Sequence, residues 1–141
     1  MGNGGSAADC QHLAAEIVGR FVKERRALPS VALTTDTSIL TAVGNDYGFE
    51  QIFSRQIDAL CQPNDVVVGI STSGNSSNVV KGMEAAKALG ALTVAMTGGS
   101  GGLLASLCDV SLVMPTAKTA RIQEGHILLG HILCECIDAH Y

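Results

Sequence analysis

Two groups of polar side chains in this chain are suited to chemistry, and the first follows a short apolar segment. The segment Val66–Ile70 is typical of a strand buried on both faces, and residues 78–89 are predicted to form a helix. The hydroxyl residues between the two are Ser71, Thr72, Ser73 and Ser76. Free N–H groups and a partial positive charge at a helix start favour an anion. A Ser-rich turn with a helix cap is the alternative, but so many hydroxyls at the end of a strand favour a phosphate-binding loop.

The second group contains acids, bases and metal ligands, and part of it follows a glycine-rich loop at residues 2–6. His12 and Glu16 lie four positions apart on a helix predicted to begin at Ala7, so they share a face. As an exposed pair they would contribute only about 0.2–0.5 kcal/mol to helix stability. Their place within about three turns of the glycine-rich loop instead favours a role in a site.

The last predicted helix, residues 119–139, holds the rest of this second group. Its polar side chains include Gln123, Glu124, His126 and His131. His131 lies in the most apolar part of the helix, where a buried polar group without a partner would be costly. It is therefore expected to be buried beside a partner, and a site is one way to supply that partner. His126 is interpreted as an interface or structural residue, and His140 as part of a frayed tail.

Short apolar runs and helical stretches must position these side chains. The apolar runs are residues 31–33, 66–70, 92–96 and 110–114, and each is followed by a polar or glycine-rich loop. The helical stretches between them are residues 36–43, 50–59, 78–89 and 103–107. The alternation predicts an α/β fold of three layers, with a mostly parallel sheet flanked by helices on both faces. Ligands bind such sheets beyond the carboxyl ends of the strands, where the polar loops lie.

Length and composition exclude several classes of function. The 141 residues fit a single domain, and 47% hydrophobic with 16% charged residues indicates a well-packed core. A net charge of −4 without a basic run argues against nucleic-acid binding, and no apolar stretch is long enough to span a membrane, so a cytoplasmic protein is expected. The five cysteines follow no disulfide spacing and are expected to be reduced. The last helix is apolar nearly all round and should be covered by the core or by another subunit.

A set of motifs spread over essentially the whole chain forms a recognisable combination. The motifs are residues 2–9, His12, Glu16, residues 19–20, 44–49, 52–55, 71–76 and 121–124, and His131. In this combination the chain resembles the phosphoheptose isomerases, a branch of the sugar isomerase (SIS) family. The resemblance implies the SIS fold, which is flavodoxin-like or Rossmann-like. Family members carry helices and a strand before the glycine-rich loop, so it also implies that this single domain, residues 1–141, lacks those elements.

By this resemblance, the sugar phosphate binds to the hydroxyl residues, and the substrate contacts further polar positions. The substrate-binding residues it implies are Asn3, Gly4, Gly5, Glu16, Asn45, Asp46, Ser71, Thr72, Ser73, Ser76 and Gln123. It implies that Glu16 and His131 are catalytic, and that one Zn²⁺ per subunit is held by His12, Glu16, Gln123 and His131. It also implies a homotetramer with sites near the subunit interfaces, and a place in heptose synthesis for lipopolysaccharide.

The side chains agree with the reaction that the resemblance implies, which converts sedoheptulose 7-phosphate to D-glycero-D-manno-heptose 7-phosphate. Moving a proton between C1 and C2 through an enediol requires a base and an acid beside the two carbons, and a carboxylate and an imidazole can fill these roles. Zinc accepts nitrogen and oxygen ligands and could polarise the carbonyl.

The spacing on the last helix bears on how such a site is assembled. Gln123 and His131 are eight positions apart, which is about 12 Å along a straight helix and about 80° around it. Zinc ligands must lie within about 2.0–2.2 Å of the ion, so two side chains so far apart can scarcely reach it from one straight helix. Either two subunits contribute to the site or Gln123 precedes the helix proper.

Other functions on the same fold stay open at this point. A bacterial regulator that binds the replication initiator shares the hydroxyl loop and residues 121–124, but that branch lacks the carboxylate of Glu16 and the histidine of His131. A non-catalytic phosphosugar sensor would need the hydroxyl loop but not His12, Glu16, Gln123 and His131 together. An isomerase for a pentose phosphate or a hexosamine phosphate would share the phosphate loop. The presence of both Glu16 and His131 favours an enzyme over a binding module.

Overall fold

A parallel sheet of three strands lies at the centre of the structure, which is a computed structural model describing residues 1–141. The strands are β1 (Val66–Ile70), β2 (Leu92–Gly98) and β3 (Val110–Met114), adjacent in that order. Val66 pairs with Leu92, and Val94 pairs with Val110. Because all three strands point the same way, their carboxyl ends meet at one edge of the sheet.

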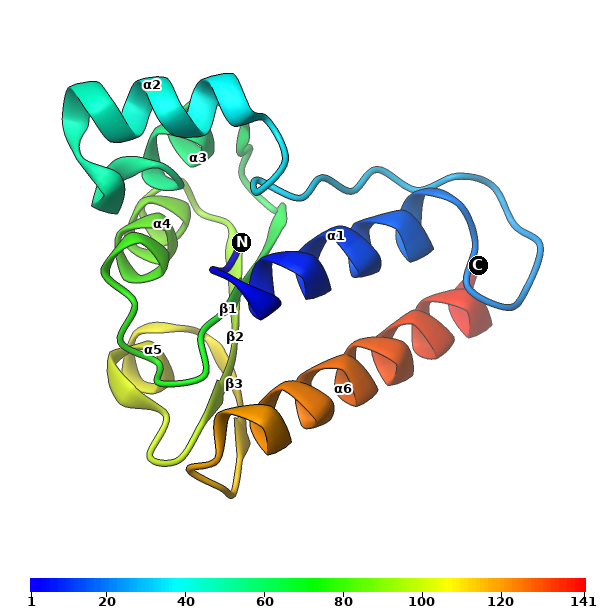
Figure 1. Ribbon diagram of the computed structural model, residues 1–141. Helices are drawn as coiled ribbons and strands as arrows, with labels where there is room; N and C mark the ends of the chain where they lie inside the picture. The colour runs from blue at the N-terminus through cyan, green and yellow to red at the C-terminus, as the bar shows by residue number, and fades with distance from the viewer.

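Helices cover both faces of this sheet (Figure 1). On one face lie α4 (Ser77–Ala88) and α5 (Gly102–Leu107), and on the other lie α1 (Gly5–Val18) and α6 (Thr119–His140). A further group packs on α4 and comprises α2 (Thr37–Tyr47), the 3-10 helix η1 (Phe49–Gln51) and α3 (Ser54–Leu60). The predicted three-layer α/β fold with a parallel sheet is confirmed.

The two faces of the sheet are buried to different extents. On the face covered by α4 and α5, eleven buried apolar residues form a continuous core, in which Val79, Met83 and Leu104 are inaccessible to solvent. On the face covered by α1 and α6, the buried apolar cluster consists of Cys10, Ala32, Ile70 and Met96. In Figure 1, α1 and α6 run side by side and extend beyond the sheet. Much of the contact between these two helices is therefore made away from the main core.

Residues 31–33, predicted to form a strand, belong to no sheet, and Leu33 lies in a turn. The free edge of β1 is occupied by the first residues of the chain. The Ile70 N–H donates to the Met1 carbonyl at 2.9 Å, and the Met1 amine donates to the Val68 carbonyl at 2.8 Å. Because that edge is taken, the apolar run is held in other ways: Leu33 is buried in the main core, and its carbonyl accepts a hydrogen bond from the Gln56 side-chain amide at 3.0 Å. The prediction of a strand here is wrong.

The other predicted elements are present with small shifts, except for one helix. Residues 50–59 form η1 and α3 instead of one helix, because Ile52 and Phe53 turn inward between them and are only 3% and 1% exposed. The last helix is continuous as predicted, but part of its apolar surface, including Leu128 and Ile132, is exposed in this single chain. All five cysteines are free thiols. None of the helices combines the length and apolar character needed to cross a membrane.

Candidate functional site

The hydroxyl loop, residues 71–76, lies at the carboxyl end of β1 and leads into α4. Ser71 is buried, and its Oγ lies 3.0 Å from the Oγ of Ser76 and 3.5 Å from the Oγ of Ser73. The Ser76 side chain makes no capping hydrogen bond to α4, and in the first turn only the Val79 N–H is taken, by Asn78 Oδ1 at 2.9 Å. The N–H groups of Ser77 and Asn78 therefore stay available to a ligand. Three hydroxyls and a helix start thus converge in the arrangement expected of a phosphate-binding loop.

The backbone of the hydroxyl loop is held by the segment that follows β2. Gly74 has a φ of 67°, and its carbonyl accepts a hydrogen bond from the Leu104 N–H at 3.0 Å. Asn75 Oδ1 accepts from a backbone N–H at the start of α5 at 2.9 Å, and the Asn75 amide donates to the Ser73 carbonyl at 3.1 Å. A Cβ at Gly74 would collide with the carbonyl oxygen of Gly101, so only glycine fits here. The hydroxyls are therefore presented by a braced backbone.

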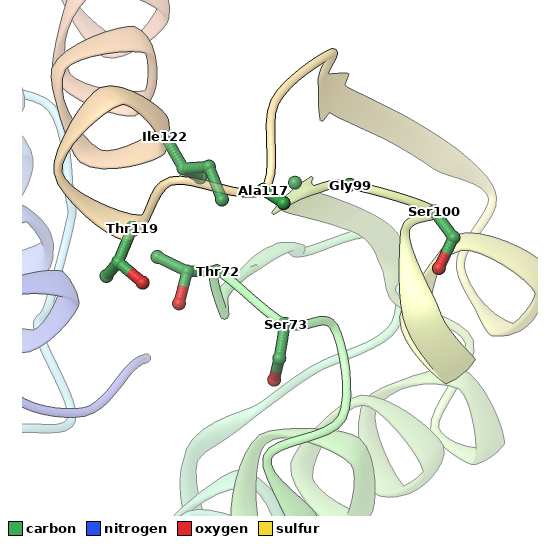
Figure 2. A pocket seen from close by; sticks show the side chains of 8 residues that line it. Thr72, Ser73, Gly99, Ser100, Ala117, Thr119 and Ile122 are labelled. Atoms are coloured by element: carbon green, nitrogen blue, oxygen red, sulfur yellow. The ribbon is translucent and has the colours of Figure 1, made fainter.

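A cavity of about 320 Å³ opens beside the hydroxyl loop. The residues that line it are Thr72, Ser73, Gly98, Gly99, Ser100, Ala117, Thr119 and Ile122. Figure 2 shows Thr72 and Ser73 on the hydroxyl loop at one side of the cavity, with Thr119 and Ile122 at the start of α6. The loops after all three strands contribute, as expected at the carboxyl edge of a parallel sheet. The predicted set omits Ser100 and Thr119. Both could have been found from the sequence, because each hydroxyl residue follows an apolar run, as the hydroxyl residues after β1 do.

The glycine-rich loop before α1 contacts both α4 and α6. Asn3 exchanges two side-chain hydrogen bonds of 2.8 Å with Asn78, which is buried at the start of α4. Gly4 has a φ of 54°, and a Cβ at Gly5 would collide with the side-chain amide of Gln123. Four predicted substrate residues, Asn3, Gly4, Gly5 and Gln123, therefore lie near one another. Asn78, which ties this loop to α4, is absent from the predicted set.

A second cluster lies farther along the contact between α1 and α6. His12 Nε2 lies 3.0 Å from Glu16 Oε1 and 3.4 Å from the Nε2 of His131. The two imidazoles meet edge to face, with ring centroids 5.1 Å apart and an angle of 60° between the planes. These three side chains form the acid–base cluster. It brings together both predicted catalytic residues, and three of the four predicted metal ligands, within a single chain.

The surroundings of His131 differ from the prediction. His131 is only partly buried. The fully buried histidine is His126, whose Nε2–H donates to the Thr97 carbonyl of β2 at 3.0 Å. The expectation of a buried His131 is therefore wrong, and His126 is the histidine that attaches α6 to the sheet.

Two buried polar atoms between α1 and α6 have no hydrogen-bond partner: His126 Nδ1 and Asp9 Oδ2. Burial raises the pKa of Asp9, and the positive charges that His126 and His12 can carry oppose this rise. Burial therefore favours the protonated form of Asp9.

The donor atoms of the acid–base cluster can be compared with those of a zinc site. Zinc binds imidazole nitrogen at about 2.0–2.1 Å with tetrahedral geometry, which places two bound nitrogens about 3.3–3.4 Å apart. The Nε2 atoms of His12 and His131 have this separation. No group of three His, Cys, Asp or Glu side chains is arranged to hold a metal ion, however. The donor types and one donor pair fit zinc, whereas a complete ligand set is not assembled.

Gln123, Asn45 and Asp46 are among the predicted site residues that lie outside the acid–base cluster. Gln123 lies within α6 and against Gly5, so the alternative in which it precedes the helix proper is wrong. Asn45 and Asp46 lie on α2, where the Asn45 amide donates to Asp46 Oδ1 at 2.8 Å. Figure 1 shows α2 well separated from α1 and α6. A single chain therefore does not bring Asn45 and Asp46 to the cluster, and their contact with substrate stays a prediction.

Comparison with known proteins identifies relatives that share both sequence and fold. The SIS domain family matches residues 1–98. The phosphoheptose isomerase of Aquifex aeolicus is 63% identical over 138 residues, which are 98% of this chain and 72% of that protein. The structure of phosphoheptose isomerase from Neisseria gonorrhoeae has a TM-score of 0.93 and 54% identity, over 99% of this chain and 74% of that one. The structure of a phosphoheptose isomerase from Francisella tularensis has a TM-score of 0.94 and 43% identity, over 98% and 74%. The chain therefore belongs to the SIS domain family and, within it, to the phosphoheptose isomerases.

Proposed function

We propose that this chain is an aldose–ketose isomerase that converts sedoheptulose 7-phosphate to D-glycero-D-manno-heptose 7-phosphate through an enediol. One observation carries this proposal: a single chain contains both a hydroxyl loop suited to a phosphate and a carboxylate and an imidazole in contact with the same histidine. Membership of the phosphoheptose isomerases supports a heptose phosphate as the substrate. The phosphate and the reacting carbons lie at opposite ends of that sugar, in agreement with two separate regions in the site.

Glu16 and His131 are assigned the proton transfers. The Glu16 carboxylate removes a proton from C1 of the ketose and delivers one to C2, while the His131 imidazole exchanges protons with the substrate oxygens. His12 contacts Glu16 through Oε1, whereas Glu16 Oε2 has no hydrogen bond within the chain. This second oxygen is therefore free to accept a carbon-bound proton.

We infer that one Zn²⁺ per subunit completes the site. His12, Glu16, Gln123 and His131 would hold it, and when bound it would supply a Lewis acid that polarises the substrate carbonyl. The 3.4 Å separation between the Nε2 atoms of His12 and His131 supports this ligand set. Zinc titration of the metal-free chain tests it. Binding of about one equivalent should be weakened strongly by His131→Asn, and equal affinity in this variant would contradict the ligand set.

We also propose a homotetramer with sites near the subunit interfaces. Three apolar residues on α6 support subunit contact: Leu128, Ile132 and Leu133 are 60%, 44% and 41% exposed. The separation of Gln123 from His131 along α6 agrees with a site completed by a second subunit. If Gln123 of one subunit completes the cluster of another, oligomers mixed from Glu16→Gln and Gln123→Ala chains should regain activity, because the cluster of one chain then meets the Gln123 of the other. No recovery after verified subunit exchange would contradict shared sites.

The proposed substrate supports a cytoplasmic location and a place in heptose synthesis for lipopolysaccharide, since sugar phosphates are made and used inside the cell. A phosphosugar-binding module or a replication-initiator-binding regulator is the alternative function. Such a module needs the hydroxyl loop but has no use for a carboxylate and an imidazole that both contact His12.

Incubation of the full chain with sedoheptulose 7-phosphate tests the proposal. Nuclear magnetic resonance should detect an aldoheptose phosphate, whereas a pentulose phosphate and a hexosamine phosphate, used as controls, should react much more slowly. Faster conversion of either control would favour a different isomerase. Binding of sedoheptulose 7-phosphate without conversion, in zinc-loaded protein, would favour the sensor and contradict the enzyme.

A further inference from the structure

The segment that follows α1, residues 19–26, crosses the end of α6 and is named here the strap. Asp138 of α6 binds it with both carboxylate oxygens. Oδ2 accepts hydrogen bonds from the N–H groups of Val22 and Lys23, each at 2.8 Å, and Oδ1 accepts from Arg25 Nε at 2.8 Å. The side chains of Arg25 and Asp138 are only 2% and 6% exposed. A buried ion pair and two backbone hydrogen bonds therefore attach the strap to α6.

Arg25 also attaches the strap to the end of α1. Its Nη1 donates to the Ile17 carbonyl and its Nη2 donates to the Glu16 carbonyl, both at 3.0 Å. These carbonyls belong to the last turn of α1, where backbone acceptors lack partners within the helix. One guanidinium thus joins α1, the strap and α6 at the level of the acid–base cluster.

The strap places Phe21 against His131. Their ring centroids are 5.3 Å apart and their planes differ by 28°, which is a stacked arrangement. The His12 ring meets the same imidazole edge to face. Apart from the contact between its Nε2 and His12, His131 makes no hydrogen bond within the chain. Two neighbouring rings, and no polar group of the scaffold, therefore set the orientation of this imidazole.

Histidines that bind metal are ordinarily oriented by a hydrogen bond from the second ring nitrogen to a carboxylate or a carbonyl. His131 lacks that restraint, since its Nδ1 has no partner in the chain. A phenyl ring stacked on the imidazole can replace the restraint, because it limits rotation of the imidazole while leaving both nitrogens free. Phe21 carries no polar atom, so its effect on the cluster acts through the orientation of His131 alone.

We propose that Phe21 is a positioning residue for His131: it holds the imidazole so that Nε2 points toward His12, and the Arg25–Asp138 pair holds Phe21 in place. The proposal rests on the proposed function, in which His131 binds zinc and exchanges protons with the substrate. It requires no contact between Phe21 and the sugar phosphate.

Three variants of the full chain test this role. Phe21→Leu removes the ring and keeps an apolar side chain, whereas Phe21→Tyr keeps a ring that can stack. Val22→Ala is the matched control, because it truncates the next residue of the strap, whose side chain is 70% exposed. Circular dichroism and Tm confirm that each variant is folded before it is compared.

Phe21→Leu should lower the zinc affinity of the metal-free chain by about tenfold or more, measured by competition with a chromophoric chelator. It should lower kcat by a similar factor and leave KM unchanged, because the hydroxyl loop is untouched. Phe21→Tyr and Val22→Ala should keep the wild-type values. Wild-type zinc affinity and kcat in Phe21→Leu would overturn the proposal.

Nuclear magnetic resonance of the metal-free wild-type chain gives a readout that needs neither activity nor a folded variant. Nuclear Overhauser effects should connect the Phe21 ring to the imidazole protons of His131, and their absence would overturn the proposal. The activity and zinc-binding measurements together separate the positioning role of Phe21 from the proposed isomerase function. If the wild type fails to convert sedoheptulose 7-phosphate but Phe21→Leu still weakens zinc binding, the proposed function fails and the positioning role stands.

Discussion

The hydroxyl loop and the acid–base cluster are built in opposite ways. Hydrogen bonds to neighbouring segments hold the loop: the Gly74 carbonyl and the Asn75 side chain bond to N–H groups of α5, and the side chain of the neighbouring Asn78 bonds to the glycine-rich loop. The acid–base cluster consists of side chains on two helices that extend beyond the sheet. Its members are partly open to solvent, with the side chains of His12 and Glu16 46% and 26% exposed.

This difference matches the two tasks of the proposed reaction. A phosphate that does not react is best held by fixed donors, and binding energy gained there can orient the rest of the sugar. Proton transfer requires side chains that can approach the reacting carbons. Changes in the hydroxyl loop should therefore affect KM and stability, whereas changes in the acid–base cluster should affect kcat.

The largest effect is expected in the acid–base cluster. Glu16→Gln keeps the size of the side chain but removes its basicity, so kcat should fall by about 10²–10⁴ with little change in KM or Tm. Steady-state kinetics with sedoheptulose 7-phosphate measure this. Glu24→Gln is the matched control, because Glu24 is a strongly exposed carboxylate of the strap, and its kcat should match the wild type. A raised KM with a normal kcat in Glu16→Gln would contradict the contrast between the two regions, because that is the pattern expected of the hydroxyl loop.

A double change in the hydroxyl loop should give the opposite kinetic pattern. Ser73→Ala with Ser76→Ala removes two hydroxyls and should weaken substrate binding by about 1–3 kcal/mol for each hydrogen bond lost to a charged group. Isothermal titration with inorganic phosphate and steady-state kinetics would measure the loss. Ser106→Ala, which removes an exposed hydroxyl from α5, serves as the control. An unchanged KM in the double variant would remove the loop from the phosphate site.

Gly74→Ala should show that the loop is braced by close backbone contact. Alanine at positive φ costs about 1–2 kcal/mol, and the collision with the Gly101 carbonyl should bring the loss of unfolding free energy to about 2–5 kcal/mol. Gly90→Ala is the matched control: its φ of 80° imposes the same strain, but the nearest atom to an added Cβ lies 3.9 Å away. Urea unfolding compares the two variants. Equal losses would mean that the close approach to Gly101 contributes nothing.

The smallest effect concerns the strap and acid pH. Hydrogen bonds from the N–H groups of Lys23 and Val22, with the Arg25 guanidinium beside them, lower the pKa of Asp138 from 3.8 to about 2. A carboxyl whose pKa is lower in the folded state stabilises the protein above its ordinary pKa, and this stabilisation is lost as pH falls from about 4 to about 2. Asp138→Asn should therefore flatten part of the loss of Tm in this range. If Tm depends on pH in Asp138→Asn as it does in the wild type, the ionised Arg25–Asp138 pair does not contribute to stability at acid pH.

The hydroxyl loop could be predicted from the sequence because the strand, the hydroxyls and the helix start are consecutive in residues 66–77. Its braces could not be predicted in the same way. The approach of Gly101 to Gly74 and the bonds between Asn3 and Asn78 join segments that are distant in the chain. Residues 31–33 show the same limit, because whether an apolar run becomes a strand depends on a free neighbouring edge.

The acid–base cluster could be predicted only in part. The pairing of His12 with Glu16 follows from helix spacing, whereas the meeting of His12 with His131 depends on how α1 packs on α6. A helix that is apolar nearly all round does not indicate which histidine faces the sheet, so the buried position of His126 could not be separated from that of His131. The stack of Phe21 on His131 depends on the strap, whose course is set by Asp138 far along the chain.

Solvent exchange tests most directly whether the hydroxyl loop binds the phosphate while Glu16 moves the proton. Sedoheptulose 7-phosphate is incubated in D₂O with the zinc-loaded wild type and with Glu16→Gln, and the products are followed by nuclear magnetic resonance. The wild type should form the aldoheptose phosphate with deuterium at C2, whereas Glu16→Gln should bind the sugar phosphate with similar affinity and show neither product nor exchange. Deuterium exchange or product formation by Glu16→Gln at the wild-type rate would show that Glu16 does not move the proton.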